Sequence, residues 1–261
     1  MIKRYIKLWW RFTLGTSQIA LQSRFGASLF LLGKILRFVF FLGFLIVLVG
    51  KTKAIAGYSI WQIVFFYATF NFLDTMPQFF FRNVYRFRQQ VMNGYFDNLL
   101  TKPLPALFHP LFGGSDMLDL IILVISIFFI VFSGMRIEHV TILDVFAYLL
   151  LLVNSFLIAL AFHIFVLGFG ILTTAVDNLI MLYRDLTQMG RLPVEIYQEP
   201  LRGLITFVVP VGIMMTFPAK ALMGLVSLQG VCLALGVGIG LVLLSLKFWQ
   251  YALKQYGSAS S

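Results

Sequence analysis

Charged residues are scarce in this chain. Lysine, arginine, aspartate and glutamate make up only 11% of its 261 residues, whereas 60% of the residues are hydrophobic. A soluble domain is about one quarter charged. This chain therefore has too little polar surface to cover a water-soluble globule, and a bilayer must cover the rest. The composition predicts an all-α integral membrane protein.

Cysteine, histidine and catalytic motifs are also rare. Cys232 is the single cysteine and cannot form an internal disulfide, and the histidines at positions 109, 139 and 163 lack the spacing of a metal site. The chain has no G-x-x-x-x-G-K-[ST] phosphate loop and no G-x-S-x-G nucleophile motif. We therefore expect no enzymatic activity and no metal or cofactor bound by this chain.

Acidic residues are outnumbered by basic ones, which gives a net charge of +10. The basic residues cluster beside the apolar runs, where anionic lipid head groups lie, so membrane lipids rather than nucleic acid are the expected partners. In residues 1–22, Lys3, Arg4, Lys7 and Arg11 share one helical face and apolar residues occupy most of the other. This pattern predicts an amphipathic helix lying on the membrane.

Long apolar runs predict six membrane spans, because about 20 apolar residues cross the hydrocarbon. Five of them are residues 27–50, 58–81, 115–135, 143–170 and 227–249. Hydropathy favours 204–224 as the remaining span, although Pro210 and Pro218 interrupt it. The alternative is the more polar range 173–190, with 191–224 forming a re-entrant segment at the outer surface. In either case the lysines and arginines place both termini in the cytoplasm.

Several ionisable residues are predicted at membrane depth, where an unpaired charge costs about 2.5–3.5 kcal/mol. Asp74 is expected to pair with Lys34 or Arg37, unless both basic side chains reach the head groups instead. For His163, a structural hydrogen bond between helices is favoured over a proton relay. The predicted intramembrane charges are Lys34, Arg37, Asp74, His163, Asp177 and Arg184.

Residues 82–114 form the long polar loop that follows the second span. Val84, Phe87 and Val91 begin a stripe of apolar residues at helical spacing, opposite an arginine-rich face. Asn93-Gly94 is a break signal, and Lys102-Pro103 ends the helical pattern. The loop is therefore predicted to contain two short helices joined by a bend. Both signs of charge on such a rigid element favour docking to a soluble partner over simple contact with lipid.

Two segments of the chain resemble a known family. "NGYFDNLLTKPLPALFHPL" is similar to the segment after the second span in permeases of type-2 ABC exporters, the ABC-2 family of the multidrug and daunorubicin-like class. "LTQMGRLPVEIYQEPLRGLITFVVPVGIMMTFPAKALMG" is similar to a run further along the same permeases. The outer-segment residues that match this second run include Gly190, Arg191, Pro193, Tyr197, Arg202, Pro210 and Pro218.

This resemblance implies a membrane subunit that works with separate ABC ATPase subunits, which bind the ATP and Mg. It implies that 173–190 is the fifth span and that a coupling helix in the loop docks on the ATPase. The coupling residues are Arg86, Arg88, Asn93, Gly94, Asp97, Leu100, Lys102, Pro103 and Leu104. A second permease, favoured as a related but distinct chain, would complete the path for a hydrophobic or amphipathic drug or lipid. The implied location is the bacterial inner membrane.

One other function is compatible with the residues. An ion-coupled secondary transporter could use Asp74, Asp177 and His163 as its coupling site, and its activity would follow a proton or sodium gradient without ATP. Such transporters usually contain two similar halves, and residues 1–130 and 131–261 show no clear repeat. The exporter permease is therefore the favoured prediction.

Overall fold

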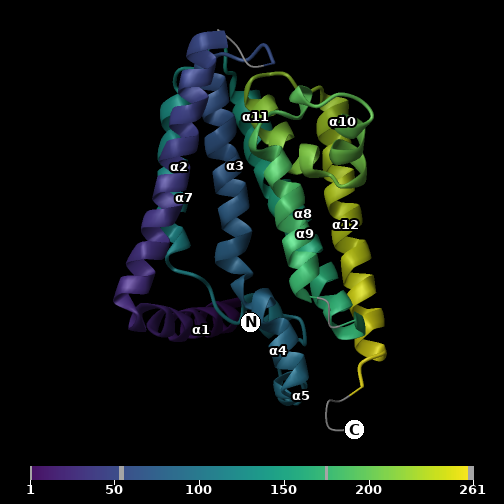
Figure 1. Ribbon diagram of the computed structural model, residues 1–261. Coiled ribbons are helices and arrows are strands. Elements are labelled where there is room, and N and C mark those ends of the chain that lie inside the picture. The colour runs from purple at the N-terminus through teal and green to yellow at the C-terminus, as the bar shows by residue number, and fades with distance from the viewer. Residues whose placement is uncertain (1, 53–55, 174–175, 258–261) are drawn as a thin grey trace.

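The computed structural model describes residues 2–52, 56–173 and 176–257, which form a bundle of long helices crossed at one end by a further helix (Figure 1). We call the end crossed by α1 (Ile2–Gln22) the α1 end and the opposite one the α10 end. The helices along the bundle are α2 (Arg24–Thr52), α3 (Ile60–Phe80), α7 (Asp119–Gly134), α8 (Ile142–Thr173), α9 (Val176–Gln188) and α12 (Leu228–Lys254). The start of α1 and the end of α12 both lie at the α1 end.

Short elements close the two ends of the bundle. At the α1 end they are η1 (Arg82–Arg86), α4 (Phe87–Met92), α5 (Tyr95–Leu100) and α6 (Phe108–Phe112). Between α9 and the α10 end they are η2 (Met189–Arg191), η3 (Val194–Ile196), α10 (Leu201–Gly203), η4 (Leu204–Val208), η5 (Gly212–Thr216) and α11 (Phe217–Leu222). The described parts of the sequence ranges predicted as spans are thus mostly helical, although 58–59 and 115–118 precede the helices of their ranges, and residues 174 and 175 of the predicted fifth span lie outside the described residues.

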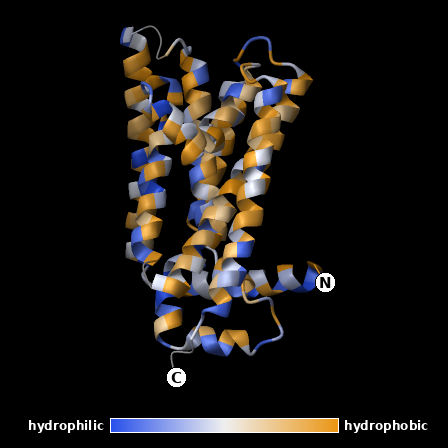
Figure 2. Cartoon of the chain, turned by 90° about the vertical axis from the view of Figure 1, so that its right-hand side faces the viewer, coloured by the Kyte–Doolittle hydropathy of each residue, from blue (hydrophilic) through white to orange (hydrophobic). Residues whose placement is uncertain are grey.

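The helical membrane architecture predicted from composition is confirmed, because apolar residues dominate the long helices (Figure 2). By length and composition, α2, α8 and α12 can each cross a membrane. The helical stretches Leu201–Val208 and Gly212–Leu222 also qualify together, but they are bent by 78° around Pro210. Helices α7 and α9 are shorter, with 16 and 13 residues. The count of six crossings therefore stays a prediction.

Helix α3 lies inside the bundle, and its sequence explains why. Ser59 caps its first turn, and the Gln62 side chain bonds back to the Ser59 backbone in a capping box. The helix carries Asn71, Asp74 and Gln78 among its apolar residues, and most of its side chains are buried against its neighbours. Polar residues at this depth are tolerated where they face protein and not lipid.

Small residues bring α8 and α12 into close contact. A Cβ atom added at Gly238 would lie 2.0 Å from Oδ1 of Asn154, and one added at Gly168 would lie 2.7 Å from the Phe248 ring. The Asn154 side chain donates a hydrogen bond to the carbonyl oxygen of Ala234 at 2.9 Å. Close backbone approach and inter-helix hydrogen bonds are the main sources of helix association in a membrane.

We expect Gly238→Ala to destabilise the protein by about 1–3 kcal/mol, because the added methyl group overpacks the α8–α12 contact and displaces Asn154. Gly236→Ala is the matched control, since a Cβ at Gly236 meets nothing within 4 Å. The control should be neutral or stabilising through helix propensity. The measurement is Tm in detergent for the two variants. Equal Tm values would show that α8 and α12 do not need a glycine at their contact.

Candidate functional site

The polar loop predicted to dock a partner forms a compact unit at the α1 end. Gly94 adopts a left-handed conformation (φ 68°) that ends α4 and starts α5. Glycine enters this region without the steric penalty of a Cβ atom, which explains the Asn93-Gly94 signal. Helix α5 ends at Leu100, ahead of Pro103. We call residues 86–104 the coupling segment.

Buried aromatic residues hold the coupling segment against the bundle. Phe87 and Phe96 are completely buried, with their ring centroids 5.1 Å apart. The Phe96 ring lies 5.2 Å from that of Tyr256 and 6.3 Å from that of Trp249. The segment is thus anchored to the end of α12, which is far away in sequence.

Two polar contacts add to this anchor. The Tyr256 hydroxyl donates a hydrogen bond to Oδ1 of Asp97 at 2.8 Å. Burial and the neighbouring Asp97 carboxylate raise the pKa of Tyr256 to about 12, so its hydroxyl stays protonated at neutral pH. Arg88 donates to Oδ2 of Asp177 at 2.9 Å, which links α4 to the first turn of α9. Both partners of this ion pair are about half exposed, so it contributes at most about 1 kcal/mol.

The outer face of the coupling segment is exposed and chemically mixed. Met92 is 61% exposed and Leu100 is 40% exposed. Arg86, Asn93, Lys102 and Pro103 are exposed, and Leu104 is partly exposed. Residues from α4 and α5, with Arg86 and the bend between the two helices, line a groove of about 580 Å³. A rigid element with apolar, polar and basic groups on its free side is suited to binding another protein.

Lys34 pairs with Asp119 at the start of α7 and not with Asp74. The predicted Asp74–Lys34 pairing is therefore wrong, because the packing of α2 brings Lys34 to α7. Asp119 is completely buried, and Lys34 also lies over the Phe30 ring. In the sequence, Asp119 is marked only by its place at the start of a long apolar run.

Asp74 accepts a hydrogen bond from the Gln78 side chain at 3.2 Å. No ion pair joins Asp74 to Arg37 in the part of the chain that the structure describes, although Arg37, Arg184 and Arg191 all interact with it electrostatically. The predicted Asp74–Arg37 contact is thus a longer-range interaction than expected.

The arginines near Asp74 line a small cavity part-way along the bundle. It has a volume of about 270 Å³ and lies between α2, α9 and η2. Its lining consists of Arg37, Met181, Arg184, Asp185, Gln188 and Arg191. The Arg191 guanidinium lies 5.4 Å from the centre of the Phe41 ring. Arg37, Arg184 and Asp185 are exposed, although most of the exposed residues around Arg37 on α2 are apolar.

The structure divides the predicted intramembrane charges into separate environments. Arg37 and Arg184 share the small cavity, whereas Asp177 is held at the α1 end by Arg88. His163 hydrogen-bonds through Nδ1 to the carbonyl oxygen of Ala159 on its own helix, at 2.7 Å. The hydrogen bond between helices predicted for His163 is therefore wrong: His163 packs against the rings of Phe81 and Tyr183, and it is Asn154 that bonds across to another helix.

The outer-segment residues shape the α10 end. A Cβ at Gly190 would lie 2.6 Å from Cβ of Met215, so only glycine lets η2 pack this closely on η5. The Tyr197 hydroxyl donates to the Met189 carbonyl oxygen at 3.0 Å, and Arg202 pairs with Glu199 at 2.7 Å. Pro193 precedes η3, Pro210 lies at the bend between η4 and η5, and Pro218 lies in the first turn of α11.

The described residues contain no group of three or more histidine, cysteine, aspartate or glutamate side chains placed to hold a metal ion. The arrangement instead offers a protein-binding face at one end and a charged cavity along the bundle.

A comparison with protein families matches residues 35–260 to the ABC-2 family transporter proteins. The match spans α3 to α12 and most of α2, including the coupling segment and the cavity. No curated protein and no solved structure matches the chain. The chain belongs to the ABC-2 transporter family, and is therefore a multi-pass membrane permease of an ABC transporter, the non-catalytic subunit that partners an ABC ATPase. The resemblance found in the two sequence segments is confirmed.

Proposed function

We propose that this chain forms part of the translocation path of an ABC exporter and is driven through its coupling segment by a separate ATPase subunit. The observation that carries this proposal is the geometry of residues 86–104, which are anchored by buried aromatic rings and expose Met92 and Leu100. The partner ATPase binds ATP and Mg, and its closure moves the coupling segment. Family membership favours this function over the ion-coupled alternative.

The proposed orientation places the α1 end in the cytoplasm of a bacterial inner membrane. The basic face of α1 and the arginines of the coupling segment lie at this end. An excess of lysine and arginine marks the cytoplasmic side of membrane proteins. Both termini are then cytoplasmic, and residues 191–224 form the outer re-entrant segment.

The cavity between α2 and α9 supports a two-permease path. Exposed charges such as Arg37 and Arg184 are costly in contact with lipid, so water or protein must cover them. A second permease, which the family resemblance favours as a related distinct chain, would enclose this face and create a polar path. The proposed substrate is a hydrophobic or amphipathic drug or lipid, because aromatic residues form 16% of the chain.

Met92→Asp tests the docking face. We expect its partner ABC ATPase to copurify at least about tenfold less well with this variant, because a charge replaces an exposed apolar contact. Met135→Asp is the matched control. Met135 is 82% exposed and directly follows α7, at the α10 end of the bundle. The measurement is ATPase recovery and ATP hydrolysis on affinity-purified permease. A folded Met92→Asp variant with full ATPase recovery would contradict the proposed docking face.

A further inference from the structure

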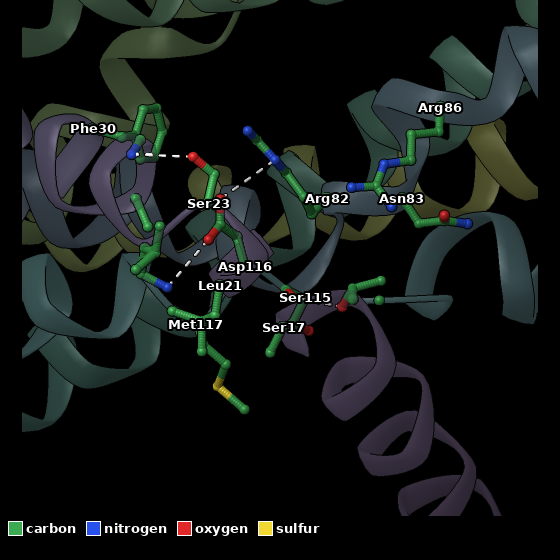
Figure 3. A pocket seen from close by; sticks show the side chains of 15 residues that line it. Ser17, Leu21, Ser23, Phe30, Arg82, Asn83, Arg86, Ser115, Asp116 and Met117 are labelled. Carbon is green, nitrogen blue, oxygen red and sulfur yellow. Dashed lines mark hydrogen bonds and ion pairs between the residues drawn. The ribbon is translucent and has the colours of Figure 1, made fainter. Parts of the chain in front are cut away.

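A separate pocket of about 480 Å³ lies at the α1 end, between α1, the start of α2, η1 and residues 114–118 (Figure 3). It shares no lining residue with the cavity near Asp74, and only Arg86 with the groove of the coupling segment. Its lining combines basic, hydroxyl and apolar side chains, among them Ser17, Leu21, Phe30, Arg82, Arg86 and Met117. This size lies within the range of small-molecule binding sites.

The walls of the pocket are fastened together. Trp9 donates a hydrogen bond from Nε1 to Oγ of Ser115 at 3.0 Å, and the Thr16 hydroxyl donates to the Ser115 carbonyl oxygen at 3.1 Å. A Cβ at Gly114 would lie 2.3 Å from the Thr16 methyl group. These contacts press α1 against residues 114–118, so the pocket is a formed part of the fold.

One side of the pocket is suited to an anion. Arg82 lies 3.6 Å from Asp116, measured from Nε to Oδ2, which satisfies only part of its guanidinium. Arg86 is exposed and makes no ion pair within the described part of the chain. The lining thus contains two guanidinium groups and one carboxylate, together with the hydroxyl groups of Thr16 and Ser23. Arginine binds phosphate through paired, charge-assisted hydrogen bonds.

The other side of the pocket is apolar. Leu21, Ala27 and Phe30 come from the end of α1 and the first turns of α2, and Met117 and Leu118 precede α7. In Figure 3, Arg82 and Arg86 lie on the opposite side of the pocket from Phe30 and Met117. The amphipathic helix α1 marks the level of the lipid head groups. A phosphate group and the start of an acyl chain would therefore find complementary surfaces here.

We infer that this pocket binds an anionic phospholipid from the leaflet at the α1 end, with its phosphate on Arg82 and Arg86 and an acyl chain against Leu21 and Phe30. The bound lipid would join α1 and α2 to η1, which leads directly into the coupling segment. A lipid bound in this pocket would therefore restrict the motion of the coupling segment, which docks the ATPase. The binding itself needs no ATPase and does not depend on the proposed transport function.

The test is photo-crosslinking in nanodiscs of phosphatidylcholine that contain a trace of phosphatidylglycerol with a diazirine in its acyl chain. We expect labelled peptides from residues 21–30 and 117–118, and an approximately tenfold loss of labelling in Arg86→Gln, because a charge-assisted bond to phosphate is lost. Ala27→Phe, which fills the apolar side without changing the charge, should lose labelling as well. Arg24→Gln is the control, since Arg24 lies beside the pocket but outside its lining.

Competition identifies the source of the phosphate. Excess unlabelled phosphatidylglycerol should displace the probe, whereas phosphatidylcholine and inorganic phosphate should not. Displacement by inorganic phosphate as efficient as by phosphatidylglycerol would overturn the lipid assignment. Equal losses in Arg24→Gln and Arg86→Gln would also overturn it, because they would indicate general attraction to the surface. Because the chain is tested alone, neither result depends on whether Met92→Asp releases the ATPase.

Discussion

Replacing Phe96 with alanine is expected to release the coupling segment from the end of α12. Phe96 is completely buried and contacts the rings of Phe87, Trp249 and Tyr256. Truncation of a buried phenylalanine costs about 3–5 kcal/mol. Phe96 belongs to the coupling segment, which lies at the α1 end of the bundle. The loss should therefore appear as local opening of residues 87–100 and not as global unfolding.

Hydrogen–deuterium exchange measures this opening directly. Amides in α4 and α5 should exchange at least about a hundredfold faster in Phe96→Ala, as a loss of 3 kcal/mol or more requires. ATPase copurification should fall in parallel, since a mobile segment must be ordered again on docking. Phe128→Ala is the matched control, because Phe128 is 59% exposed on α7. Unchanged exchange in α4 and α5 would show that Phe96 does not anchor the segment.

Replacing Lys34 with methionine is expected to destabilise the whole bundle by about 3–5 kcal/mol. The variant leaves the completely buried Asp119 without its cation. The other carboxylate oxygen, Oδ2, has no hydrogen-bond partner among the described residues, so Lys34 is the only direct partner of this carboxylate there. A carboxylate left without its cation in an apolar interior is among the most costly single defects that a substitution can create.

The double variant Lys34→Met/Asp119→Leu distinguishes the contribution of the ion pair to stability from that of side-chain packing. An apolar pair of similar volume should restore stability to near the starting value, because both desolvation penalties disappear together. Tm in detergent and the yield of monodisperse protein are the measurements. Lys51→Met is the control, a lysine at the exposed end of the same helix. If Lys34→Met matched this control, the Lys34–Asp119 contact would carry no stability.

The sequence predicts much of the coupling segment correctly. The Asn93-Gly94 break and the proline at 103 are local signals, because a left-handed turn needs glycine and the residue before proline leaves helical geometry. Both act within a few residues, so the structure shows them where the sequence places them. The anchors Trp249 and Tyr256 were not predictable, because they come from the far end of the chain.

The sequence by itself determined the class of this protein. Scarce charge and long apolar runs require a bilayer, and two ordered motifs identify the ABC-2 family, because these properties depend on composition and local order. Only the tertiary structure decided which side chains meet. Lys34 finds Asp119 across 85 positions, and Arg191 joins Arg37 and Arg184 around one cavity. Such pairings depend on the rotation of each helix about its axis and on its axial position relative to its neighbours. Hydropathy specifies neither.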